Sequence, residues 1–154
     1  MAKIKFSLAH KDPELINLIS ATDQKTLALW AIECTERVMP YFESKYSKDS
    51  RPRQALNVLK KWIATDVFSM PVIRKASLDA HAAARDVGED SSARSAARAA
   101  GQAVATAHVP KHAYGPAIYA QQAIYRSSEP SEAENNVLKE RNWQYQRLKT
   151  LSGK

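Results

Sequence analysis

The chain has 154 residues, of which 44% are apolar, and a formal net charge of +7. A chain of this length can bury one core that is stable without disulfides or metal ions. Cys34 is the single cysteine, so no intrachain disulfide can form, and we expect the protein to lie in the reducing cytoplasm. No stretch approaches the roughly 20 apolar residues that span a bilayer, and no apolar run precedes Lys11, so we expect neither secretion nor membrane insertion. Basic residues are spread along the chain without a tail or block, which does not favour nucleic-acid binding.

Apolar residues recur at helical spacing through the first half of the chain. Asp12 and Asp23 are residue types that cap helix N-termini, and Pro52 fits the first turn of a helix. Pro40 is expected to end or kink the helix before it, and Gly88 can adopt the left-handed conformation of a helix end. Four helices are predicted here, over residues 12–19, 24–39, 52–63 and 70–87.

Alanine dominates the next predicted helix, residues 93–107, which Asp90-Ser91-Ser92 would cap. So little side-chain bulk lets neighbouring backbones approach closely, and we therefore expect this helix at the centre of a bundle. The residues expected to supply bulk around it are Trp30, Trp62, Tyr119 and Ile124.

Two further helices are predicted after an irregular segment that contains Pro110, Gly115 and Pro116. They span residues 117–126 and 132–151, with a linker between them. The pattern as a whole predicts an all-α fold, a single compact bundle of six or seven helices. We expect residues 1–126 to form the bundle core and residues 127–154 to form a linker and a C-terminal helix packed on the same domain.

The last helix carries apolar residues that need cover, Trp143, Leu148 and Leu151. They can be covered by the bundle itself or by a second copy of the chain. A homodimer through this helix is therefore an open alternative.

Three histidines are the residues best suited to chemistry. His108 and His112 are four residues apart, which puts both rings on one side of a helix, and His81 follows Asp79 in another helix. They would either join a polar network or hold a metal ion. The proline between His108 and His112, and the lack of a carboxylate beside them, favour the polar network.

Arginines and aromatic residues mark a candidate partner-binding face. Glu36-Arg37 and Arg51-Pro52-Arg53 predict an ion-pair network, because arginine binds carboxylates with two parallel hydrogen bonds. The alternative is that these arginines contact a partner, since arginines beside aromatic residues are typical of interface hot spots. The residues predicted to form this face are Tyr41, Tyr46, Arg51 and Arg53.

Other catalytic patterns are not supported. Cys34 lies on a strongly apolar helix and is expected to be a buried packing residue. The four glycines are scattered and form no phosphate-binding loop, and no serine lies in a nucleophile elbow. We therefore expect no cofactor and no nucleotide-dependent or triad-type catalysis.

Four segments together resemble a known family. They are LALWAIECTERVMPYFE (27–43), RPRQAL (51–56), LDAHAAAR (78–85) and AAGQAVATAHVPKHAYGPAIYAQQAI (99–124). Their order is similar to that in the immunity-five-like group of bacterial immunity proteins, which are small and helical. The resemblance implies a cytoplasmic, non-enzymatic protein that binds a cognate toxin and blocks its active site or folding. The alternatives are a metal-dependent helical enzyme that uses His81, His108 and His112, or a nucleic-acid-associated accessory protein.

Overall fold

The structure is a computed structural model that describes residues 6–8 and 11–154. These residues form helices and contain no strand, which confirms the all-α prediction. None of these helices combines the length and the apolar character needed to cross a membrane. The helices are α1 (Pro13–Ser20), α2 (Gln24–Glu36), α3 (Met39–Glu43), α4 (Arg51–Thr65), α5 (Met70–Asp86), α6 (Ser92–Ala105), the 3-10 helix η1 (Pro110–Ala113), α7 (Tyr114–Ser127) and α8 (Ala133–Ser152).

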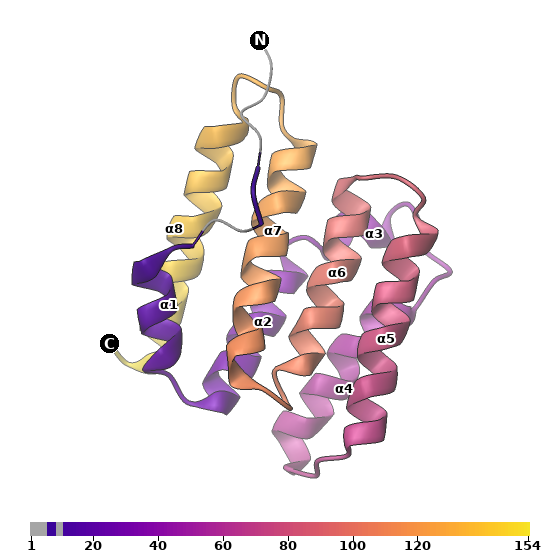
Figure 1. The fold of residues 1–154 in the computed structure, drawn as a ribbon, viewed down its shortest axis with the longest axis vertical. Helices are drawn as coiled ribbons and strands as arrows, with labels where there is room; N and C mark the ends of the chain where they lie inside the picture. Colours follow the sequence, from indigo (N-terminus) through magenta and orange to yellow (C-terminus); the bar gives the residue numbers. More distant parts are fainter. Residues whose placement is uncertain (1–5, 9–10) are drawn as a thin grey trace.

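Four of the long helices lie side by side in the order α8, α7, α6 and α5 (Figure 1). Helices α2, α3 and α4 lie behind this row, and α1 packs against α8. Helix α6 contacts α2, α3, α4, α5 and α7, so it occupies the centre of the bundle as its alanine content predicts.

Several helix ends form where the sequence predicts them. The carboxylate of Asp12 accepts a hydrogen bond from the Leu15 amide at 3.2 Å, and that of Asp23 accepts one from the Thr26 amide at 3.0 Å. Gly88, just beyond α5, has a φ of 80°, the left-handed conformation expected of a residue that stops a helix.

Prolines begin two helices differently from the prediction. Pro40 lies in the first turn of the short helix α3, where its missing amide hydrogen leaves no bond unmade, and so Tyr41 to Glu43 are helical. Pro116 likewise lies in the first turn of α7, which begins at Tyr114 rather than at Ala117. Helix α7 thus starts earlier than predicted, α2 ends at Glu36 instead of continuing to Met39, and α3 is a helix that the prediction lacked. A proline is excluded from a helix interior but not from its first turn.

The core has two parts along α6. Trp30 and Trp62 pack in the first cluster with Ala100 and Ala103, so large residues of α2 and α4 fill the space beside a helix without bulk. Ile124 packs against the second cluster, which contains alanines of the first half of α6. Tyr119, the fourth residue expected to supply bulk, is half-buried and belongs to neither cluster.

A buried polar network joins α8 to the core. The Trp30 indole donates to the Gln144 carbonyl at 2.9 Å, and the Gln144 side chain bonds both Gln121 and the Ala117 carbonyl at 2.9 Å. Leu148 is fully buried in the same region. The chain itself therefore covers much of the face that the sequence left open to a second copy.

Candidate partner-binding face

The face predicted from the sequence lies on α3, the following loop and the start of α4. Arg53 lies between the carboxylates of Glu36 and Glu43, which belong to the ends of α2 and α3. Its contact with Glu43 is bidentate, at 3.0 and 2.7 Å, and this contact lowers the pKa of the Glu43 carboxyl. One guanidinium thus joins three helices.

Arg51 is paired in the same way at the neighbouring position. Its guanidinium contacts Asp49 at 2.9 and 2.7 Å and Asp86, the last residue of α5, at 2.8 Å. The hydrogen bond from Arg51 also lowers the pKa of the Asp49 carboxyl. The ion-pair network predicted for these arginines is therefore present. Its carboxylates neutralise the positive charge of the arginines, so little of that charge is left to attract an acidic partner.

The two tyrosines are half-buried beside this network. The rings of Tyr46 and Phe42 stack with centroids 5.2 Å apart. The hydroxyl groups of Tyr41 and Ser127 are hydrogen-bonded at 3.0 Å, so the phenol oxygen is engaged with the end of α7. The tyrosines and the arginines thus lie on successive parts of one edge of the bundle, and each has a partner within the chain.

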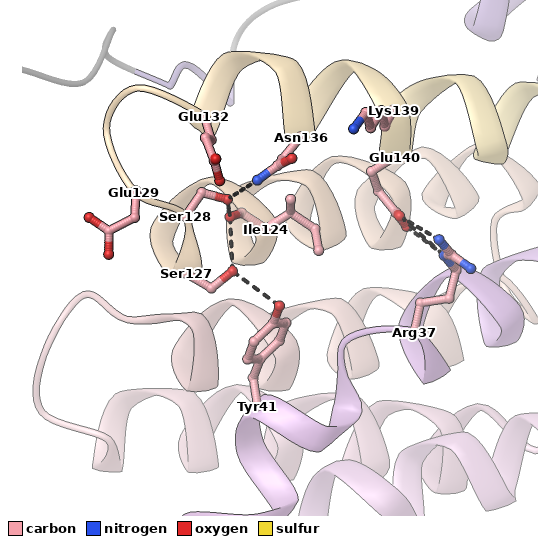
Figure 2. Close-up of a pocket in the computed structure, with 10 residues that line it drawn as sticks. All are labelled: Arg37, Tyr41, Ile124, Ser127, Ser128, Glu129, Glu132, Asn136, Lys139 and Glu140. Carbon is pink, nitrogen blue, oxygen red and sulfur yellow. Dashed lines mark hydrogen bonds and ion pairs between the residues drawn. The ribbon is translucent and has the colours of Figure 1, made fainter.

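Tyr41 also lines a polar hollow of about 430 Å³ between α3 and the α7–α8 turn (Figure 2). Opposite Tyr41, the guanidinium of Arg37 contacts the buried carboxylate of Glu140 with three distances between 2.8 and 3.1 Å. The same guanidinium lies over the Trp143 ring at 3.8 Å. This pair is not predicted from the sequence, because 103 positions separate its members and nothing in α8 distinguishes Glu140 from the other acids.

Another part of the lining of this hollow is a hydrogen-bonded group of polar residues at the α7–α8 turn. Asn136 donates to the Ser128 hydroxyl at 3.1 Å, and Ser127 and Ser128 both donate to the Ile124 carbonyl (Figure 2). These bonds tie the α7–α8 turn to its flanking helices. They are consistent with a structural role for the hollow.

The three histidines have separate partners. His81 Nδ1 lies 2.8 Å from an Arg98 nitrogen, and burial together with Arg98 and Arg85 lowers the pKa of His81 to about 4. Its ring packs so closely on Gly101 that a Cβ there would lie 2.7 Å from Nε2. His81 is therefore a neutral acceptor in a polar contact, as the network interpretation expects.

His108 and His112 do not share a helical face. Helix α6 ends at Ala105, and His112 belongs to the 3-10 helix that Pro110 begins, so the expected four-residue alignment is wrong. The His108 ring lies beside Phe68, with centroids 6.2 Å apart, and His112 Nδ1 lies 3.2 Å from the Gln102 side-chain oxygen. Within residues 6–8 and 11–154, no three histidine, cysteine or acidic side chains are grouped so that they could hold a metal ion.

Cys34 is fully buried on α2, as its apolar surroundings predict. Burial raises the pKa of its thiol well above the ordinary value, and the neighbouring carboxylate of Glu140 acts in the same direction. The thiol is therefore held in its protonated, unreactive form.

The chain matches a known protein family. The family described as "Imm-5 like putative immunity protein" matches residues 17–151. Searches of the curated proteins and of the solved structures found no match. The matched region runs from within α1 almost to the end of α8, so it includes both Arg37 and its partner Glu140.

Proposed function

The chain belongs to the Imm-5 like family of immunity proteins, and from this membership we propose that it binds a cognate bacterial protein toxin and neutralises it without catalysis. The observation that carries the proposal is the family match over residues 17–151, which spans nearly the whole bundle. We further propose that it acts in the cytoplasm, since a chain with a single cysteine suits a reducing compartment.

The chemistry of the described residues supports binding over catalysis. The Cys34 thiol is buried and protonated, and His81 is held by Arg98. A partner-binding protein needs instead a rigid surface, because little conformational freedom is then lost on association. The ion pairs of Arg51 and Arg53 and the Gln144 network supply that rigidity.

Co-expression tests the proposal. The protein is produced in a heterologous host together with the product of the adjacent gene, and growth is measured with and without the immunity chain. We expect that the adjacent gene alone arrests growth and that the chain restores growth and co-purifies with its product.

An unrelated helical protein expressed at the same level is the control and should not restore growth. Growth arrest that the chain does not relieve, with no complex in the lysate, would contradict the proposed function.

A further inference from the structure

Large apolar side chains are exposed together at the corner between α4 and α5. Val67 is 73% exposed, Val72 is 51% exposed and Phe68 is 47% exposed, all within six consecutive positions. We call these three residues the corner patch. Single exposed apolar residues are common on protein surfaces, but a contiguous group beside a hollow is typical of an interaction site.

A groove runs from the corner patch between the two helices. Val67 and Val72 line it together with the buried residues Trp62 and Ile73, and its volume is about 310 Å³. Its lining is mainly apolar, so a side chain that enters it would exchange water for hydrocarbon contacts. The groove can accept one apolar side chain of a partner.

The helix ends that flank this apolar surface carry more basic than acidic residues. Residues 57–78 contain a single acid, Asp66, which already pairs with Lys25 at 3.2 Å. Lys61 lines the groove itself, and within the described part of the chain it forms no ion pair. Lys75 pairs with Asp79 at 2.6 Å. The other basic residues of this segment form no ion pair within the described part of the chain, and we call them the basic rim: Lys60, Lys61 and Arg74.

The turn that presents the corner patch is fixed at both ends. Asp66 adopts the left-handed conformation, with a φ of 57°, and this residue ends α4 and turns the chain outward. The Phe68 ring lies beside the His108 ring, and Pro71 fixes the first turn of α5. A patch held in this way loses little freedom when a partner binds.

We propose that the corner patch is the surface on which the toxin docks, and that the matching toxin surface is an apolar projection surrounded by carboxylates. The inference rests on the proposed function. A second copy of this chain does not fit, because it would bring the same basic rim against itself. Single-stranded nucleic acid does not fit either, because successive bases stack on several aromatic rings, whereas Trp62 is buried and Phe68 is the one aromatic residue of the corner patch.

A pair of matched variants tests the inference. The probe is the toxin domain encoded beside this gene, separated from the co-expressed complex in guanidinium and refolded. We expect the double variant Val67→Asp with Val72→Asp to weaken binding by at least about 100-fold, because charge replaces the apolar centre of the interface. The matched control Leu138→Asp alters a side chain of similar exposure, 55%, on α8, and should bind within about two-fold of the unaltered chain.

Urea unfolding of each variant separates lost binding from lost folding, and the milder pair Val67→Ser with Val72→Ser repeats the test if the aspartates unfold the chain. The double variant Lys61→Glu with Arg74→Glu should associate more slowly, and the association rate of the unaltered chain should fall as salt is added. Unchanged affinity in both corner variants, or an equal loss in Leu138→Asp, would overturn the docking site. An association rate independent of salt would overturn the acidic partner surface. Failure of the unaltered chain to bind the toxin would instead contradict the proposed function itself.

Discussion

The two ends of the α4–α5 hairpin treat charge and apolar surface in opposite ways. At one end, Arg51 on α4 contacts Asp86 on α5, and Arg53 is held by Glu36 and Glu43. At the other end, roughly 20 Å along α4, the corner patch is exposed, and Lys60, Lys61 and Arg74 form no ion pair within the described part of the chain. At the first end, which we call the paired end, the charged side chains bind one another. At the second end, which we call the open end, apolar surface and positive charge remain available to a partner.

This difference shows that arginines and aromatic residues in a small bundle do not by themselves indicate an interface. A residue type that is common at interfaces is equally common in intramolecular networks, and only its neighbours distinguish the two. Substitutions at the paired end should therefore change stability, and substitutions at the open end should change binding.

The largest loss of stability is expected for a substitution of Ile73 at the open end, and its neighbour Val72 is the control. Ile73 is 4% exposed, while Val72 projects into solvent. Ile73→Ala should lower the free energy of unfolding by about 3 kcal/mol because it leaves a cavity under the groove. Val72→Ala should lower it by less than about 0.5 kcal/mol. Urea titration of both variants measures the difference, and equal losses would mean that Val72 is a packing residue and not part of a free surface.

A smaller loss of stability is expected when Glu140, the buried partner of Arg37, is replaced. Glu140→Ala removes the partner of Arg37 and should cost about 2 kcal/mol, less than for a fully buried pair because Arg37 is partly exposed. Glu129→Ala alters an exposed acid at the rim of the same hollow and should leave the unfolding midpoint unchanged. If both variants unfold at the midpoint of the unaltered chain, the Arg37 contact is not structural.

Lowering the pH should weaken the contact that His81 makes between α5 and α6, midway along the α4–α5 hairpin. The pKa of His81 is lowered from 6.5 to about 4, so between these values protons bind the unfolded chain more readily than the folded one. Stability should therefore fall as the pH drops from 6.5 to 4, by about 1 kcal/mol after allowance for solvent screening of the partly exposed ring.

The variant His81→Gln should flatten this pH dependence, whereas His112→Gln, at an exposed position, should not. Thermal unfolding at a series of pH values measures both. A His81→Gln profile that keeps the full slope would assign the acid sensitivity to other groups.

The smallest effect is expected at the paired end. Arg53→Ala removes two carboxylate contacts at a partly exposed position and should cost about 1 kcal/mol of stability, with toxin affinity unchanged. Arg74→Ala removes an exposed arginine without an ion pair in the described chain and should change stability little. A loss of toxin affinity in Arg53→Ala, with the fold intact, would restore the face predicted from Tyr41, Tyr46, Arg51 and Arg53.

The local signals in the sequence predicted the helices well. Asp12 and Asp23 cap helices as expected, because capping depends on neighbours three positions away. The central place of α6 also followed from its composition, because a helix of alanines can only be covered by larger residues from elsewhere. Pro116 misled the prediction, because a proline marks an irregular segment and the first turn of a helix equally well.

The candidate sites are formed by residues that are far apart in the chain, and contacts of this kind cannot be predicted from a single sequence. Arg37 and Glu140 form a bidentate pair across most of the chain, and no local pattern links them. The exposure of Val67 and Val72 was equally hidden, since a short apolar segment after a helix is expected to be buried. Which apolar residues remain uncovered is decided by packing, and packing is known only from the assembled helices.

Hydrogen exchange of the complex with the toxin domain tests the central claim most directly. Amide exchange would be followed with and without the toxin across all peptides of the chain. We expect slower exchange in the complex over residues 61–73, which carry the corner patch, and no change over residues 41–53. Protection confined to residues 41–53, with residues 61–73 exchanging as in the free chain, would contradict it.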